Sequence, residues 1–530
     1  MPPILLARHD QLDLSLYRRI AFDREPVALA PELLEAVARS RTAFLAQLDS
    51  GASAYGVNTG LGFLAAQPVQ TIDQASFQRS ILAGRSAGTG HPLSEPVVRG
   101  VMLLRLVGFL SGYAAVSPSL CTFIAERLND GWYPVVPGGA SGAPGEIVQL
   151  AHLFATLVGD GFVHVDGRAV PAASALGARG LTPFELAAKE GIALINGAPL
   201  APALAVPLLM RGQALLEHAT LCGALAIAVT GASVRPYSPR IGELKGDPGQ
   251  LSVHRRLWSL LGLADPREPR RPRDPADMRD PVDSRPDRLQ NTRQAPVSLR
   301  VIPQVHGAAA DVLDHLRAHL ERELRAVTDS PVFLPANDAH AEPEGLYSTG
   351  NFHAQYSVLL LDASATAFTQ VVNLLEKRLH RLLDTRFSEL PDQLTPDPGR
   401  QSGVVVLHKQ VMGLTAQARM LAAPAGIHAI DGSTGQEDFQ THTLLAAHQL
   451  DGILSVLELA LAHELVALRQ ARFLAGAPLP AALEEAVALV SEIVAPVVED
   501  RSLAEDVERC RRLVASGRLI GGVRSPGIWS

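Results

Sequence analysis

Three short strings place a polar side chain among apolar or glycine-rich neighbours, where it could move a proton or hold a carboxylate. Tyr55 opens the glycine-rich string YGVNTGLG, and a tyrosine in such a loop can act as a general base when its surroundings favour the phenolate. Asn196 lies in the apolar string LING, where its amide must find hydrogen-bond partners. Arg300 is the lone arginine of SLRVIPQVHG, and a buried arginine needs an anionic partner such as a substrate carboxylate.

Taken singly, each of these side chains has a structural explanation at least as good as the functional one. No P-loop, HExxH, GxSxG or dinucleotide-binding motif occurs in a useful context. The 17 histidines do not cluster at metal-ligand spacing, so a satisfied structural histidine is expected at each position and no metal site is predicted.

The order and spacing of the longer strings resembles the ammonia-lyase and aminomutase family that uses the methylidene-imidazolone prosthetic group (MIO). The resemblance runs from about residue 30 to 475. It implies a mainly α, ammonia-lyase-like fold with a long central helical bundle, assembled as a homotetramer whose active sites draw on three subunits. The matching strings are YGVNTGLG at 55–62, GTGHPL at 88–93, PVVP at 134–137, KEGIALING at 189–197, SLRVIPQVHG at 298–307, TDSP at 328–331, GNFH at 350–353, SG at 402–403 and GQED at 435–438.

The string that would carry MIO departs from the family pattern. In the family an Ala-Ser-Gly tripeptide cyclises and dehydrates within a string that resembles GASGDLAPLAH, whereas this chain reads PVVPGGASGAPGEIVQLAH. One register places Ala143, Pro144 and Gly145 on the tripeptide, with a single deletion upstream. Because proline has no β-hydroxyl to eliminate, MIO could not form there by the usual dehydration, and no cofactor is predicted.

A second register uses Ala140, Ser141 and Gly142 and would restore an autocatalytic MIO. It requires a deletion of four residues before the motif and an insertion of three after it, so we favour the first register.

The resemblance also assigns the remaining site residues. Tyr55 matches the family's catalytic base, and Arg300 matches the arginine that binds the substrate carboxylate. Asn196, Gln294 and Phe352 match further active-site residues.

Other positions differ from the family. Arg85 stands where histidine ammonia-lyases carry a substrate-recognising histidine, and Val297 replaces a loop tyrosine. The pair His408-Lys409 replaces a Gln-Tyr pair, and Gln417 replaces a glutamate. Deamination of histidine, phenylalanine or tyrosine is therefore poorly supported, while Arg85 and Lys409 would add positive charge to the pocket. The predicted catalytic set is Tyr55, Arg85, Asn196 and Arg300, and the predicted substrate-binding set is Gln294, Phe352, Lys409 and Gln417.

These residues predict MIO-independent acid–base chemistry, namely an elimination, addition, isomerisation or cyclisation on a small carboxylic acid, amino acid or thioester. Arg300 and Asn196 would hold a carboxylate or carbonyl and place Tyr55 near a Cα or Cβ proton. Two alternatives stay open: an MIO-dependent ammonia-lyase or aminomutase built on Ala140-Ser141-Gly142, and a non-catalytic tetrameric scaffold. Retention of Tyr55 and Arg300 argues mildly against the scaffold.

The bulk composition is that of a large folded protein. The chain has 530 residues, 47% of them hydrophobic, and a formal net charge of −7, which does not suggest a basic nucleic-acid surface. Its three cysteines form no CxxC pair, and neither a signal peptide nor an uninterrupted membrane span is evident. A cytoplasmic protein that binds neither nucleic acid nor membrane is expected.

Helical spacing of apolar residues predicts the elements that must position these side chains. Helical stretches are expected over 30–50, 95–130, 305–328, 353–384, 403–423, 438–474 and 479–515. We predict an N-terminal lobe over 1–200, a central helical bundle over 201–475 and a C-terminal helical segment over 476–530. Residues 264–293 form a Pro/Arg/Asp-rich insertion, expected to be a solvated loop; the alternative is an Arg-rich lid or docking strip for an anionic partner.

Overall fold

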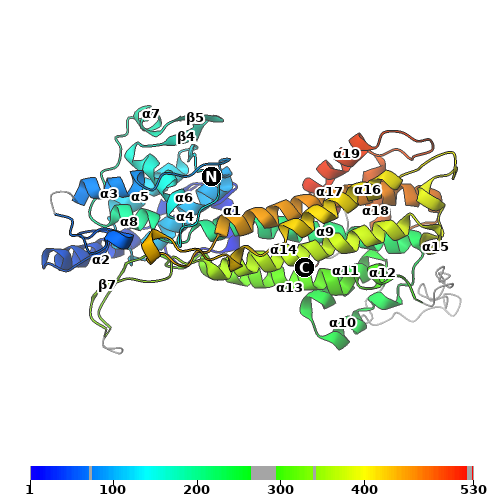
Figure 1. The fold of residues 1–530 in the computed structure, drawn as a ribbon, viewed down its shortest axis with the longest axis horizontal. Helices are drawn as coiled ribbons and strands as arrows, with labels where there is room; N and C mark the ends of the chain where they lie inside the picture. The colour runs from blue at the N-terminus through cyan, green and yellow to red at the C-terminus, as the bar shows by residue number, and fades with distance from the viewer. Residues whose placement is uncertain (1, 71–73, 264–293, 338–341, 522–527, 529–530) are drawn as a thin grey trace. The chain divides into compact units, whose positions relative to one another are not determined.

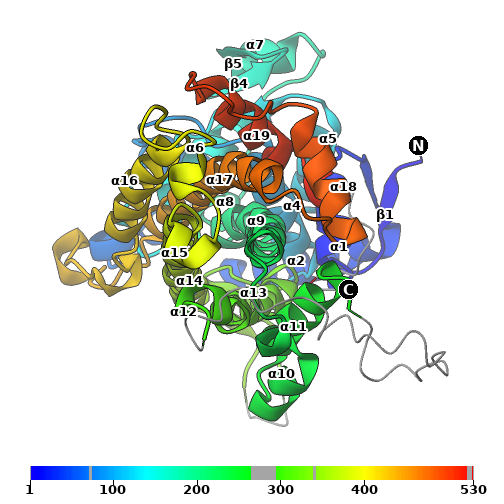
Figure 2. The same cartoon turned by 90° about the vertical axis from the view of Figure 1, so that its right-hand side faces the viewer.

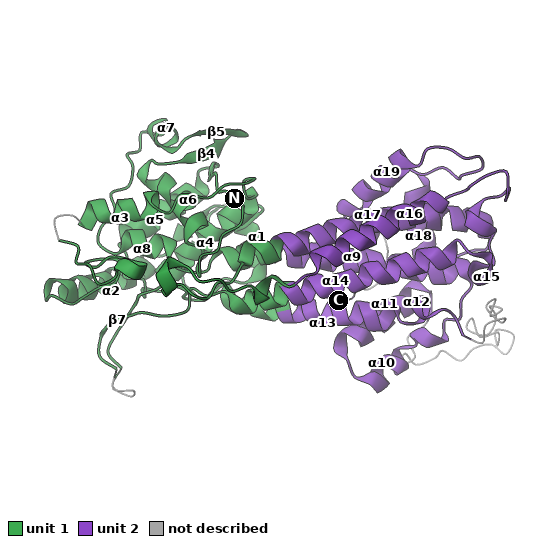
Figure 3. Cartoon of the chain, viewed as in Figure 1, with its two compact units in different colours: residues 1–207, 316–361, 424–447 green, residues 208–315, 362–423, 448–530 purple. Residues whose placement is uncertain are grey.

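The computed structural model describes residues 2–70, 74–263, 294–337, 342–521 and 528. The predicted insertion at 264–293 therefore lies outside the described residues. Two compact units interleave along the chain (Figure 3): unit 1 comprises 1–207, 316–361 and 424–447, and unit 2 comprises 208–315, 362–423 and 448–530. The predicted three-part division was drawn along the sequence rather than from contacts, and it stays a prediction.

The chain passes between the units five times, once between residues 423 and 424 and otherwise within four long helices. They are α9 (Leu200–Thr230), α13 (Ile302–Glu323), α14 (Gln355–Leu382) and α17 (Thr443–Ala475). All four contribute buried apolar side chains to the core, and α9 is apolar nearly all round, as expected of a buried helix.

Unit 1 combines short helices with small sheets (Figure 1). Its helices include α1 (Leu14–Ala21), α2 (Pro31–Asp49), η1 (Gly62–Leu64), α3 (Gln74–Ala83), α4 (Glu95–Leu110), α5 (Pro118–Asn129), α6 (Ile147–Ala155), η3 (Thr156–Val158), α7 (Ala172–Gly177), α8 (Glu190–Ile195), η8 (Ala425–Ile427) and η9 (Ser433–Gly435). Its strands are β1 (Ile4–Leu6) parallel to β2 (Val27–Leu29), β3 (Tyr133–Pro134), β4 (Phe162–Val165) and β5 (Arg168–Pro171) in one antiparallel sheet, and β6 (Val332–Leu334) antiparallel to β7 (Gly345–Tyr347).

A tight hairpin completes the sheet that carries β3. Strands β4 and β5 pair Val165 with Arg168, so the turn has only two residues, Asp166 and Gly167. Both have positive φ, 48° and 76°, as a type I′ hairpin turn requires. Because β3 pairs with β4 and directly precedes the Pro/Gly-rich string, this small sheet fixes where that string begins.

Helix α4 is the buried centre of unit 1. It is buried at most of its positions, including two arginines. The Arg99 guanidinium donates to the carbonyls of Leu128 (2.7 Å) and Ile20 (2.8 Å), and Arg105 donates to the carbonyl of Asn196 (3.2 Å). Backbone carbonyls thus accept from both buried cations, which ties α4 to distant segments.

Unit 2 is a helical bundle. Seen end on, α9 lies between α17 and α13 (Figure 2). Besides its parts of the four long helices, unit 2 contains η4 (Arg235–Tyr237), α10 (Pro239–Lys245), α11 (Pro248–Leu260), α12 (Val297–Arg300), α15 (Thr385–Ser388), η7 (Asp392–Leu394), α16 (Val405–Leu421), α18 (Ala481–Ser491), α19 (Ala504–Ala515) and α20 (Arg518–Gly521).

The mainly α prediction is confirmed, and two predicted helices are corrected. The stretch over 95–130 is broken into α4 and α5, because Gly112 takes a positive φ of 86° and Pro118 begins a new helix. The stretch over 479–515 is broken into α18 and α19, because Pro496 cannot continue a helix. The other predicted helices are confirmed with shifted ends.

Two helices are long and apolar enough to cross a membrane by length and composition alone. They are Glu190–Thr230, which joins α8 to α9, and Gln355–Leu382. In their most apolar windows 89% and 61% of the positions are buried within the protein. The core helix of a folded protein has the same character, so neither helix is strong support for a membrane span.

A buried ion pair links α14 to α17 in unit 2. Arg378 donates from Nε and Nη2 to the two carboxylate oxygens of Glu464, each at 2.7 Å, and both side chains are almost wholly buried. Parallel bidentate hydrogen bonds of this kind fix orientation as well as distance. The two helices are therefore held in one axial register.

Removal of only one charge of this pair should destabilise the protein strongly. We expect Arg378→Met to lower the free energy of unfolding by about 3–5 kcal/mol, because Glu464 would remain buried without a counter-ion. Urea and thermal unfolding measure the change, with Arg400→Ala, in an exposed pair with Asp397, as the control that changes little. The double variant Arg378→Met/Glu464→Leu should recover much of the loss, and equal destabilisation by the single and double variants would contradict this account.

Candidate active site

A cavity of about 600 Å³ in unit 1 gathers six of the residues predicted from the sequence. All of its lining residues belong to unit 1. The six are Tyr55, Arg85, Pro144, Gly145, Asn196 and Phe352. They come from five separate parts of the chain, so residues that are distant in the sequence lie together in this cavity.

The loop that carries Tyr55 is held by its own polar groups. The Gly62 backbone N–H donates to the Tyr55 hydroxyl at 2.8 Å. The Asn58 side chain accepts from the Ala54 N–H at 2.7 Å, which closes the first turn of the loop. Gln78 donates to the Gly56 carbonyl at 2.8 Å, so the loop is also anchored on α3. The phenol oxygen is consequently fixed at the cavity with one donor already directed at it.

The Pro/Gly-rich string is held against the GTGHPL string by a short ladder of backbone hydrogen bonds. Leu93 donates to Val136 at 2.8 Å, Gly138 to His91 at 2.9 Å, and Gly139 to Thr89 at 2.9 Å. A Cβ atom at Gly139 would lie 2.3 Å from the Thr89 carbonyl oxygen, so this approach requires glycine there. The ladder sets the position from which the following residues enter the cavity.

The two registers for the MIO tripeptide differ in what they present to the cavity. Pro144 and Gly145 line it, whereas Ala140, Ser141, Gly142 and Ala143 do not. Ser141 instead has a shielded hydroxyl with no hydrogen-bond partner among the described residues. Since the tripeptide at the cavity has proline in the centre, the residues there do not fit MIO formation by dehydration.

Glu146 follows Gly145 in the Pro/Gly-rich string, and its side chain contacts the N-terminus of α9. Its carboxyl group accepts from the backbone N–H groups of Leu200 and Ala201, the latter at 2.7 Å. Burial raises the pKa of Glu146 to about 8, although the two N–H donors and Arg105 act in the opposite direction. Its neighbour Gly145 is thereby tied to the first turn of α9.

Asn196 is positioned from both its side chain and its backbone. Its Nδ2 donates to the Ser330 carbonyl at 2.7 Å, and its own carbonyl accepts from Arg105 at 3.2 Å. Behind it, the buried Lys189 Nζ lies 2.8 Å from Asp329 Oδ2, and Arg105 Nη1 lies 3.9 Å from Asp329 Oδ1. We call Lys189, Asp329 and Arg105 the buried charge cluster.

The cavity contains charges of both signs. Burial lowers the pKa of the Arg85 guanidinium, while its electrostatic attraction to Tyr55 and Glu437 acts the other way. Glu437 and Asp438 both line the cavity, as does His353. A cation and carboxylates in one cavity together suit a substrate that carries both charges.

The sequence interpretation missed Glu437, Asp438 and His353 as site residues. They lie within the GQED and GNFH strings, so the signal was present in the motifs that carried the resemblance. The structural role of the buried charge cluster was also missed, although Lys189 belongs to KEGIALING and Asp329 to TDSP.

Four predicted site residues belong to unit 2 and do not line this cavity. Arg300 ends α12, where its Nε donates to the Ala295 carbonyl at 2.8 Å. Gln294, Lys409 and Gln417 are exposed, the last two on α16. Their assignment to substrate binding, like the catalytic assignment of Arg300, stays a prediction.

The sequence predicted no metal site, and this stays a prediction, but three potential ligand side chains meet in unit 2. Glu376, His380 and His408 place one potential ligand atom each within 4.8 Å of one another. Spacing along the sequence did not reveal this group, because His408 comes from a different helix than the other two.

Known proteins resemble this chain over nearly its whole length. The model of the family described as aromatic amino acid lyase matches residues 12–493. A histidine ammonia-lyase from Geobacillus thermodenitrificans is 34% identical over 98% of this chain and 99% of its own length, and one from Anaeromyxobacter is 33% identical over 97% and 99%. The crystal structure of tyrosine aminomutase from Streptomyces globisporus has a TM-score of 0.86 at 28% identity and covers 98% of each chain.

The tight approach of Arg105 to Gly197 offers a test of how Asn196 is held. A Cβ atom at Gly197 would lie 2.2 Å from Arg105 Nη2. We expect Gly197→Ala to lower stability by about 1–3 kcal/mol, since the guanidinium must move away from Asp329 and the Asn196 carbonyl. Urea unfolding measures this against Gly177→Ala, whose added Cβ meets nothing within 4 Å. Equal stability of the two variants would show that Arg105 is not held tightly.

Proposed function

The chain belongs to the aromatic amino acid lyase family, and on that premise we propose that its unit 1 cavity carries out lyase-type acid–base chemistry without MIO. The substrate is a small carboxylic acid, amino acid or thioester. The observation that carries the proposal is Pro144, which lines the cavity together with Tyr55 and Asn196. A proline has no hydroxyl to lose, whereas the base and the polar groups around it are retained.

Proton transfer to Tyr55 is the central step of this proposal. The phenolate takes a proton from the carbon next to the substrate's acyl group, and the electron pair of that bond moves onto the acyl oxygen. Arg85 and the Asn196 amide stabilise the resulting enolate-like charge. Return of the electron pair then expels a group from the β-carbon, which is elimination, or takes up a proton at another position, which is isomerisation. Positioning supplies much of the rate enhancement of such a reaction.

The unit 2 residues enter the proposal through assembly. In a homotetramer, Arg300, Gln294, Lys409 and Gln417 of one copy would complete the cavity of another, with Arg300 on the substrate carboxylate. This arrangement agrees with their exposed or partly exposed positions. It also agrees with the charges that line the cavity. Because Arg85 is assigned to the region of Tyr55, unit 1 offers no second arginine or lysine in this lining for the substrate carboxylate.

A second candidate is an MIO-dependent ammonia-lyase or aminomutase built on Ala140-Ser141-Gly142. It is favoured by the 34% identity to a protein named histidine ammonia-lyase and by the shielded hydroxyl of Ser141, which has no hydrogen-bond partner in the described part of the chain. The near full-length similarity to named lyases favours either enzyme over a non-catalytic scaffold.

The mass of the peptide that spans 134–152 separates the two candidates. We expect the unmodified mass, because the tripeptide at the cavity is centred on Pro144. The measurement is a high-resolution intact mass with peptide mapping, and Ser141→Ala serves as a control that cannot dehydrate at this position. A wild-type peptide lighter by two waters would establish the MIO-dependent candidate.

Replacement of Tyr55 by phenylalanine should abolish proton abstraction. In D₂O, proton NMR follows exchange of Cα and Cβ protons in a panel of histidine, tyrosine, phenylalanine, their deaminated acids and acyl thioesters. For any substrate that exchanges, we expect Tyr55→Phe to slow the exchange by about 10²–10⁴-fold, because the general base is lost. The control is Tyr113→Phe, whose side chain does not line the cavity. Unchanged exchange in Tyr55→Phe would exclude Tyr55 as the base.

A further inference from the structure

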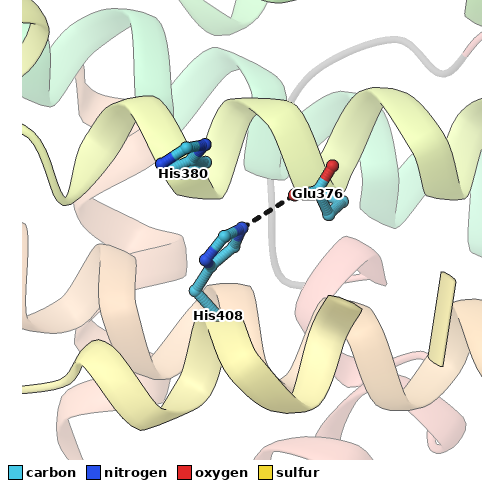
Figure 4. Close-up of side chains that lie close together, drawn as sticks. All are labelled: Glu376, His380 and His408. Carbon is cyan, nitrogen blue, oxygen red and sulfur yellow. Dashed lines mark hydrogen bonds and ion pairs between the residues drawn. The ribbon is translucent and has the colours of Figure 1, made fainter. Parts of the chain in front are cut away.

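Two histidines and a glutamate meet between α14 and α16 in unit 2 (Figure 4). Glu376 and His380 lie one turn apart on α14, and His408 faces them from α16. His408 Nε2 and Glu376 Oε1 are 2.7 Å apart and hydrogen-bonded. The rings of His380 and His408 stack with centroids 4.6 Å apart and an interplanar angle of 16°. None of these residues lines the unit 1 cavity or is used by the proposed function.

We propose that Glu376, His380 and His408 bind one divalent transition-metal cation, for which Zn²⁺ is the best match. Two imidazoles and one carboxylate form a common protein ligand set for zinc. Ligand atoms bound to zinc at about 2.0–2.1 Å lie about 3.3 Å apart in a tetrahedral site. The three potential ligand atoms here lie within 4.8 Å of one another, and side-chain rotations that unstack the two imidazole rings would bring them to that spacing.

Metal binding sets a condition on the ionisation states of these groups. A metal requires both imidazoles to be neutral and the carboxylate to be ionised. Lys377 Nζ, 2.7 Å from Glu376 Oε2, is the principal competitor for the carboxylate.

The site has an open side. His380 and His408 line a separate cavity of about 450 Å³, together with Asp384, Asp392 and Gln393. A metal bound by three side chains from two helices would therefore have room for water or a small anion at its fourth position, as in zinc sites with an exchangeable ligand. It would also cross-link α14 to α16, directly next to Lys409, one of the predicted substrate-binding residues.

Zinc titration of the tag-free, chelator-treated full-length chain tests the proposal. Isothermal titration calorimetry should show one Zn²⁺ bound per chain, and Co²⁺ in place of Zn²⁺ should give a visible absorption band. His380→Ala should weaken zinc binding by at least about tenfold, and Glu376→Gln, which keeps the side-chain volume, should weaken it as well. The matched control is His448→Ala, because His448 is an exposed histidine of unit 2 outside the cluster.

Thermal unfolding gives an independent readout that needs no substrate. Added Zn²⁺ should raise the melting temperature of the wild type and of His448→Ala, since a ligand that binds only the folded state stabilises it. It should not raise that of His380→Ala, a variant expected to fold because His380 is exposed. Binding of less than one equivalent by the wild type, or equal binding by His380→Ala and His448→Ala, would overturn the proposal.

Discussion

The buried charge cluster is the constraint on which the candidate active site depends. Asp329 is buried, and an isolated carboxylate there would be far too costly without Lys189 and Arg105 beside it. The three charges come from the start of α8, from α4 and from the segment before β6. Because each must stay in contact with the others, these three parts of unit 1 cannot move apart independently. Hydrogen bonds then fix Asn196, whose carbonyl accepts from Arg105 and whose side-chain amide donates to the Ser330 carbonyl.

Around that fixed point, the cavity is built from loops whose geometry leaves little freedom. Backbone hydrogen bonds with the GTGHPL string place Pro144 and Gly145, and Glu146 secures the end of the same string on α9. Tyr55 arrives on a loop closed by Asn58 and anchored through Gln78. The result is a phenol held in place in a cavity that Arg85 also lines, which is the arrangement that the proposed proton abstraction needs. The proposal of acid–base steps without an electrophilic prosthetic group rests on Pro144 at this cavity and not on family membership.

Unit 2 also contains buried charges that are paired. Arg378 and Glu464 lie in its core as a bidentate pair, so the long helices carry charge where their sequence is otherwise apolar. Glu376 on α14 and His408 on α16 form a second pair that is less deeply buried, and His408 lines a cavity. One pair is closed and structural in character. The other has a cavity beside it, and this open space is what the proposed metal site requires for an exchangeable ligand.

The sequence by itself determined the family, the helical fold and the residue types of the site. The strings around Tyr55, Asn196 and Pro144 were sufficient because motifs of that length and order rarely recur by chance, and the apolar periodicity of α13, α14 and α17 is visible without coordinates. It did not determine where helices break inside apolar stretches, as between α4 and α5, where Gly112 and Pro118 overrode the helical spacing.

Only the tertiary structure decided which groups meet. It showed Pro144 and not Ser141 at the cavity, in agreement with the register that the sequence favoured, and it revealed the backbone ladder with Thr89 and His91 that holds the string. It paired Lys189 with Asp329 across 140 residues and His408 with Glu376 across 32. A buried charge needs a partner of opposite charge or a hydrogen bond, and the fold can supply it from a distant part of the chain. The spacing of residues along the sequence therefore does not predict such contacts.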